Sequence, residues 1–271
     1  MLAPRSRLQP RGLGVVSYHP AVRLSLSEFC PELERRFGSL DFSGGVTPEI
    51  AEGLNQLLAS LDVNDPALLA QLRLDEDQNR TNGYTSIGLF SPKKNRSLLL
   101  WAAGYRSGDW SKIHFHDSTQ FLYEGYVPAV GPVETVEYEM GDVWEISGKI
   151  WVQLKSTRTL RQIPGDGQVY CEPRGNQIHR NGNSGSGIVW LISLYVRTKD
   201  RDGQLSEFHS VSMEDRAHLA PRLPSGLNLE HLFQLAPSPW LLRHSGASPV
   251  WAFIPSAQPT PDFTITLPSS S

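Results

Sequence analysis

Two histidines, His114 and His116, stand one residue apart in the segment 113–116 (IHFH). The neighbouring residues are typical of a β-strand, in which successive side chains point to opposite faces, so both imidazoles would lie on one face. Such a pair can supply two adjacent ligands to one metal ion. On its own the pattern is a weak signal, because two polar residues on a surface strand produce it as well.

The spacing around the pair strengthens the metal interpretation. Gly108 precedes His114 by five intervening residues, and a second segment about 60 residues later contains, in order, Gly167, Pro173, Gly175, His179 and Asn183. The two segments resemble the two motifs of the cupin superfamily, with one extra residue before His179. This resemblance predicts that His114, His116 and His179 bind a metal, and it implies a mainly β jelly-roll barrel with the metal inside its mouth.

Within that superfamily the sequence is most similar to the cysteine dioxygenase (thiol dioxygenase) family, over roughly residues 48–197. The matching segments are 84–86 (YTS), 101–104 (WAAG), 113–116 (IHFH), 178–183 (IHRNGN) and 191–195 (LISLY). The resemblance implies a non-heme Fe(II) enzyme that binds a small substrate and O2 side by side. Imidazole ligands alone do not exclude other divalent transition metals.

Several positions depart from the family pattern. Gln120 stands where most cupins have a glutamate ligand, which leaves three neutral histidines. Ser86 replaces the arginine that clamps the substrate carboxylate in the family, and Ser193 replaces the histidine that supports the tyrosine. Tyr195 is retained as the catalytic candidate. Phe121 stands near the position of the family's crosslinking cysteine, so we expect no thioether.

These departures predict a substrate other than free cysteine, and a bulkier or more aromatic one. The expected substrate-binding residues are Ser86, Arg106, Gln120, Phe121 and Ser193. Arg106 is a candidate replacement for the missing clamp, although an exposed turn arginine is the simpler interpretation. Two other functions stay open: a non-oxidative metallocupin that uses the metal as a Lewis acid, and a ligand-binding cupin without activity.

The remaining sequence pattern predicts three regions. Residues 1–80 are expected to be mostly helical and packed on the barrel, with Thr47 and Pro48 opening the clearest helix. Residues 81–200 carry the β-rich runs, and the run 188–196 is apolar on both faces, as in a central strand. Glu134, Glu137 and Glu139 are interpreted as a solvated strand face. Residues 201–271 form an extension in which 212–220 and 227–235 are expected to be short helices.

Composition limits the partners. The formal net charge of −3 and the pI near 6.2 provide no basic excess for nucleic acid or an anionic membrane. No apolar run approaches the roughly 20 residues that cross a bilayer, and we expect a cytoplasmic monomer or homodimer. The two cysteines, Cys30 and Cys171, lack metal-ligand spacing and are expected to be reduced.

Overall fold

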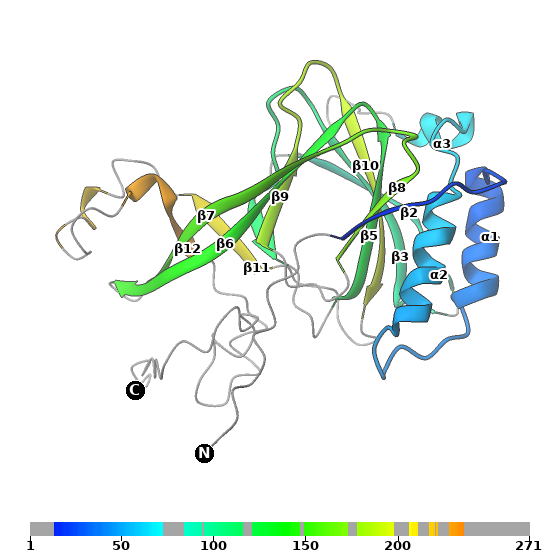
Figure 1. Cartoon of the computed structure of the whole chain (residues 1–271), viewed down its shortest axis with the longest axis horizontal. Helices are drawn as coiled ribbons and strands as arrows, with labels where there is room; N and C mark the ends of the chain where they lie inside the picture. The colour runs from blue at the N-terminus through cyan, green and yellow to red at the C-terminus, as the bar shows by residue number, and fades with distance from the viewer. Residues whose placement is uncertain are drawn as a thin grey trace.

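Two antiparallel sheets face each other, and three helices cover the outer side of one of them (Figure 1). The computed structural model describes residues 14–72, 84–93, 95–115, 121–146, 149–172, 178–197, 206–210, 217–219, 221 and 228–235. The helices are α1 (Leu26–Phe37), α2 (Pro48–Ala59) and α3 (Pro66–Gln71). The strands are β1 (Gly14–Ser17), β2 (Thr85–Phe90), β3 (Leu98–Tyr105), β4 (Ile113–Phe115), β5 (Phe121–Val130), β6 (Val133–Ile146), β7 (Lys149–Gln162), β8 (Gln168–Glu172), β9 (Ile178–Gly182), β10 (Val189–Arg197), β11 (Ser206–Ser210) and β12 (Leu232–Leu235).

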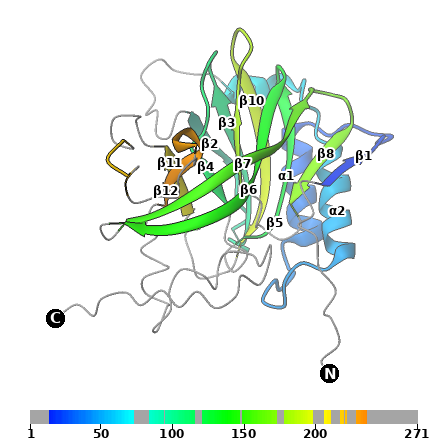
Figure 2. The ribbon, with the colours of Figure 1, turned by 60° about the vertical axis from the view of Figure 1, so that its left-hand side comes forward.

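The strand order is that of a jelly roll. The first sheet runs β1-β8-β5-β10-β3-β2, and the second runs β11-β12-β7-β6-β9-β4. From β3 to β10, every connection passes from one sheet to the other, except the long β6–β7 hairpin, which Figure 2 shows curving along the second sheet. Two interleaved Greek keys of this kind define the jelly roll of cupins, so the predicted fold class is confirmed.

The second sheet closes on itself through the C-terminal extension. Strand β11 pairs with β4 on one side and β12 on the other, and β12 pairs with β7. The prediction of a helix over 227–235 is therefore wrong beyond its first turn: Leu229–His231 form a 3-10 turn, and Leu232–Leu235 form a strand. A short apolar run fits a helix or a strand, and here the pairing with β7 decides.

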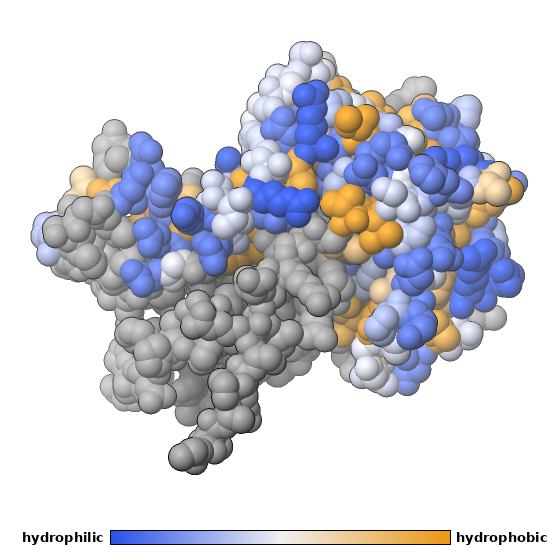
Figure 3. All heavy atoms as spheres, viewed as in Figure 1, coloured by the Kyte–Doolittle hydropathy of each residue, from blue (hydrophilic) through white to orange (hydrophobic). Residues whose placement is uncertain are grey.

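The helices pack on the outer face of the first sheet. Helix α2 begins at Thr47, whose side chain accepts a hydrogen bond from the Ile50 amide, with Pro48 in the first turn, as predicted. Helix α1 begins after a Ser25–Glu28 capping box. Their apolar faces contact the outward side chains of β3, β5 and β10 in one large core. The surface over these helices is mostly hydrophilic (Figure 3).

Alternation along the strands separates this outer core from the interior between the sheets. On β10, Trp190, Ile192 and Leu194 point to the helices, whereas Leu191 and Ser193 point inward. Because both faces are covered, β10 is buried along most of its length and lies between β3 and β5, which confirms the prediction of a central strand. Among the described residues, no helix is both long and apolar enough to span a membrane.

Candidate metal and substrate site

Two of the three predicted metal ligands face each other across adjacent strands. His114 on β4 and His179 on β9 are direct partners in the antiparallel register, so their side chains share the inner face of the second sheet. The ring centroids are 4.6 Å apart and the planes are tilted by 57°. His114 is 8% exposed and His179 is fully buried. The fold therefore brings together two imidazoles that lie 65 positions apart in the sequence.

A backbone contact fixes the tautomer of His114. Its Nδ1 lies 2.7 Å from the carbonyl oxygen of Lys112. A carbonyl oxygen can only accept, so Nδ1 carries the proton and donates, and the neutral ring keeps its lone pair on Nε2. A metal-ligating histidine commonly has this arrangement, with one ring nitrogen held by the protein and the other left as the ligand atom.

A small cavity of about 80 Å³ lies beside His114, between the two sheets. Part of its wall is aromatic: Tyr84 lies tilted against Trp101 and Tyr105, with ring centroids 6.4 and 5.5 Å apart, and Trp101 meets Tyr195 edge-on at 6.0 Å. Sites for drug-sized ligands range from about 300 to 1,000 Å³. Bounded by the described residues, the cavity has room for only a few non-hydrogen atoms, so it gives no support to the bulkier substrate expected from the sequence.

Tyr195 lines this cavity with its phenol held protonated. Burial raises its pKa well above the ordinary value, and the Glu124 carboxylate, by its charge and by a hydrogen bond, raises it further. A weaker opposing effect comes from a hydrogen bond with Ser193. Glu124 and Tyr195 are register partners on β5 and β10, and Glu124 is 2% exposed. Tyr195 is thus a hydroxyl donor, not a phenolate, at any ordinary pH.

Arg197 brings a positive charge to the same cavity. It follows Ser193 and Tyr195 at alternate positions of β10, and its backbone amide donates to the Ser97 carbonyl at 2.7 Å. The Nε atom of Arg197 is buried and has no hydrogen-bond partner among the described residues. A buried donor of this kind is costly unless a ligand or water supplies the acceptor.

A buried hydrogen-bond network continues from the cavity across the inner face of the second sheet. The Thr135 hydroxyl donates to the side-chain oxygen of Asn181 at 2.5 Å and accepts from the side-chain amide of Gln162 at 3.0 Å. The backbone N–H of Asn181 donates to the Ser111 hydroxyl at 3.0 Å. All four residues are at most 6% exposed. Small barrels usually fill this space with apolar side chains, so the polar lining marks this end of the barrel as a site.

Glu137 does not lie on a solvated face, and that prediction is wrong. Its side chain is 2% exposed, and it is the direct register partner of His179 on β9. Glu139, two positions further along β6, is exposed, and it lies beyond Tyr138, the residue at which the described pairing with β9 ends. Glu134 is partly buried and accepts a hydrogen bond from Ser184 at 2.6 Å.

Of the other predicted site residues that the structure describes, Ser193 lines the cavity, whereas Ser86 and Arg106 do not. Ser193 lines the cavity and is 3% exposed. Ser86 is opposite Ala103 in the register, but it lies exposed on the edge strand β2. Arg106 lies in the turn after β3, where its amide donates to Asp109 at 2.9 Å, and it is not among the described cavity-lining residues. His116 and Gln120, together with the side chain of Phe121, fall outside the described part of the structure.

Charged or polar residues of the cavity that the sequence did not indicate include Glu124, Asn181 and Arg197. The available signal was strand parity. Asn181 lies two positions after His179, and Arg197 lies two positions after Tyr195, so each shares a face with a residue already selected. Glu124 is a single carboxylate within the apolar run FLYEGYV, which is itself unusual for a buried strand.

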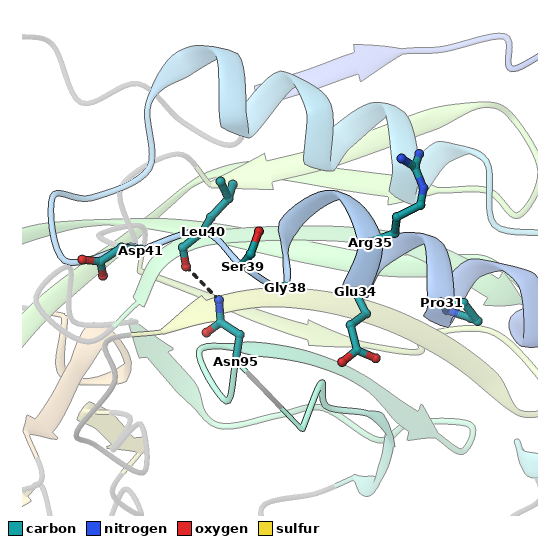
Figure 4. A pocket seen from close by; sticks show the side chains of 8 residues that line it. All are labelled: Pro31, Glu34, Arg35, Gly38, Ser39, Leu40, Asp41 and Asn95. Carbon is teal, nitrogen blue, oxygen red and sulfur yellow. Dashed lines mark hydrogen bonds between the residues drawn. The ribbon is translucent and has the colours of Figure 1, made fainter.

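A larger hollow of about 580 Å³ lies far from this chemistry, at the C-terminal end of α1 (Figure 4). Asn95 crosses it and donates to the Leu40 carbonyl at 3.0 Å. Its described lining mixes Glu34, Arg35 and Asp41 with backbone and contains no histidine or cysteine. We therefore place the functional site at the smaller inner cavity.

The donor set at the inner cavity fits a divalent transition-metal ion. His114 offers Nε2, His179 faces it, and imidazole is a good ligand for Fe, Zn, Cu and Ni. Among the described residues, no three His, Cys, Asp or Glu side chains come close enough to form a complete ligand group. A third protein ligand would come from His116, which lies outside them.

Comparisons with known proteins add the following. No protein-family model and no curated protein matches the sequence. Among solved structures, the chain is similar to oxalate oxidase in complex with glycolate, with 14% identity and a TM-score of 0.33, covering 47% of this chain and 57% of that one. The chain thus spans little more than half the length of that protein.

Two shorter proteins are also similar. The Cupin_2 domain of an XRE family transcriptional regulator from Enterobacter cloacae shares 18% identity, with coverage of 44% of this chain and 99% of that one and a TM-score of 0.30. A Cupin 2 conserved barrel domain protein from Salinispora arenicola shares 16%, with coverage of 46% and 86% and a TM-score of 0.31. Likenesses this distant do not distinguish one activity from another.

Proposed function

We propose that this chain is a metallocupin that holds one divalent transition-metal ion through His114, His116 and His179. The observation that carries the proposal is the in-register pair of His114 and His179, buried 4.6 Å apart beside a polar cavity. The tautomer of His114 supports it, because Nε2 keeps the lone pair.

We further propose that the ion is Fe(II) and that the protein is an oxygenase of the thiol dioxygenase type. Iron at this position would supply the chemistry of binding the substrate and O2 together. The residues of the chain do the rest. Tyr195 keeps its proton in a hydrogen bond with Glu124, which holds the phenol at the cavity wall, and the neighbouring aromatic side chains help to exclude bulk water.

The substrate is a small thiol or another small metal-chelating molecule. The cavity volume of about 80 Å³ limits it to a few atoms. An exposed Ser86 cannot provide a clamp, whereas Arg197 presents a buried Nε at the cavity wall and supplies a positive charge in place of the arginine that the family has at the position of Ser86. Arg197 takes this role in place of Arg106. The expectation that free cysteine is not the substrate stays a prediction.

Metal analysis and oxygen uptake test the proposal. Protein purified under nitrogen should contain iron, or take up one equivalent of Fe(II) per chain, and should consume O2 with at least one member of a panel of small thiols that includes free cysteine. The His179→Ala variant should lose both properties. Metal binding without O2 uptake would point to a non-oxidative metallocupin or a binding protein. Absence of metal binding would refute the proposal.

A further inference from the structure

Glu137 is a buried carboxylate on the inner wall of the barrel. It is 2% exposed, and glutamate is almost never fully buried unless a partner compensates its charge. Its register partner on β9 is His179, which is fully buried. Direct partners in an antiparallel pair project to the same face with Cβ atoms about 4.5–5.5 Å apart, so the carboxylate is within reach of the imidazole.

Three adjacent strands therefore align Glu137, His179 and His114 in one row, on β6, β9 and β4. The three side chains do not form a group that could hold a metal together. Glu137 is thus placed to act on the site through His179 and not as a ligand. His114, at the other end of the row, already has its Nδ1 held by the Lys112 carbonyl.

We propose that Glu137 is a positioning residue that accepts a hydrogen bond from Nδ1 of His179, fixing the ring with Nε2 toward the metal. This inference rests on the proposed metal site. Ligating histidines commonly donate their other ring N–H to a carboxylate or a carbonyl, which orients the ring and makes the ligand atom more basic. The negative charge of Glu137 would also offset part of the positive charge of the metal ion, and the sequence has a neutral glutamine, Gln120, at the position where most cupins have a glutamate ligand.

The size of the effect follows from comparable sites. Loss of such an outer partner lowers metal affinity about 10- to 100-fold. Glu137→Gln keeps an acceptor oxygen but loses the charge, so it should lower affinity by about 10-fold. Glu137→Leu loses both the acceptor and the charge, so it should lower metal affinity by close to 100-fold. The control is Glu139→Gln on the same strand, because Glu139 is exposed and pairs with Lys155 in the register.

Two measurements on the full chain test the proposal. The first is the affinity for Co(II), followed by its visible absorption under nitrogen, in the wild type and the three variants. The second is the tautomer of His179 in the metal-free protein, from two-bond nitrogen–proton NMR correlations. The tautomer does not depend on any metal, so it remains informative if the proposed metal site fails. Thermal unfolding of each variant reports on structural damage.

We expect the affinity order wild type, Glu137→Gln, Glu137→Leu, with Glu139→Gln unchanged. The His179 proton should sit on Nδ1 in the wild type and in Glu137→Gln, and should redistribute in Glu137→Leu. Unchanged Co(II) affinity in folded Glu137→Leu, or an Nε2–H tautomer of His179 in the wild type, would overturn the proposal. A wild type with Nδ1–H but no Co(II) binding would refute the metal site and leave the Glu137–His179 contact standing.

Discussion

Replacing Arg197 should remove most of the affinity of this site for an anionic ligand. Its Nε is buried at the cavity wall, whereas the residue as a whole is only partly buried. Arg197→Met keeps most of the side-chain length and removes the charge and every donor. Arg197→Lys keeps the charge but loses the planar fork that binds a carboxylate through two donors.

The magnitude follows from the number of hydrogen bonds. A side-on contact would use Nε and one terminal nitrogen, and hydrogen bonds to charged groups contribute about 1.5–3 kcal/mol each. The terminal nitrogen is nearer to solvent, so we take the lower value for both, about 3 kcal/mol in total. Since about 1.4 kcal/mol corresponds to a factor of ten, Arg197→Met should weaken carboxylate binding about 100-fold. The carboxylate affinity of Arg197→Lys should lie between those of the wild type and Arg197→Met.

The assay compares two small thiols, one of which has a carboxylate where the other has a methyl group. Mercaptoacetate and ethanethiol are titrated calorimetrically into protein loaded with Co(II) under nitrogen. Arg197→Met should lower the affinity for mercaptoacetate and leave that for ethanethiol nearly unchanged. The matched control is Arg106→Met, since Arg106 lies in the turn after β3 and away from the described cavity lining. An unchanged ligand preference in Arg197→Met, or an equal loss in Arg106→Met, would refute the reasoning.

Three further predictions follow. Glu124→Gln removes a buried negative charge from the cavity and should raise mercaptoacetate affinity several-fold in the same titration; weaker binding would contradict the assigned cavity. Burial, the main cause, raises the pKa of Tyr195 well above that of an unfolded tyrosine, near 10, so the unfolded state alone loses this proton above pH 10. The contribution of this proton to the free energy of unfolding should be complete below pH 10 and should be lost above it. In urea titrations above pH 10, the free energy of unfolding should therefore fall by about 1.4 kcal/mol per pH unit more in the wild type than in Tyr195→Phe. Equal slopes in the two proteins would contradict the raised pKa. Thr135→Val leaves the Asn181 and Gln162 amides without their hydroxyl partner and should cost about 2 kcal/mol or more of unfolding free energy, whereas Thr159→Val on the exposed face should be nearly neutral; equal losses would exclude the network.

Local signals were sufficient to predict much of the fold. Thr47 and Pro48 begin α2 because the threonine caps the first turn and proline needs no amide partner there. The run 188–196 is apolar on both faces because helices cover one side of β10 and the other sheet covers its opposite side. In both cases the residues of the segment are enough to predict its conformation or its burial.

Long-range pairing accounts for the elements that were not predicted. Leu232–Leu235 became a strand because β7 supplies a hydrogen-bonding edge, and nothing within that segment indicates this partner. Glu137 points inward like Val133 and Thr135, with which it alternates along β6, but nothing within this segment indicates that β9 pairs there and that this face lines the barrel interior. Both errors arose where a distant strand decides the conformation.

The site was partly predictable for a related reason. His114 and His179 were selected by motif spacing, and the register brings them face to face. Ser86 marked the position where the family's clamp is missing, and Arg106 was the expected replacement because it lies close in sequence to the histidine pair, whereas the positive charge at the cavity comes from Arg197, on another strand. Motif spacing identifies groups that must converge, but it does not reveal which strand supplies a replaced function.

The metal content of the His114→Ala variant tests the central claim most directly. The wild type, purified under nitrogen and supplied with Fe(II), should bind one ion per chain. His114→Ala should lose that ion while keeping the circular dichroism spectrum and thermal unfolding of a folded barrel, because His114 lies at the edge of the cavity and not in the large core under the helices. A folded His114→Ala protein that retains one tightly bound ion per chain would contradict the account.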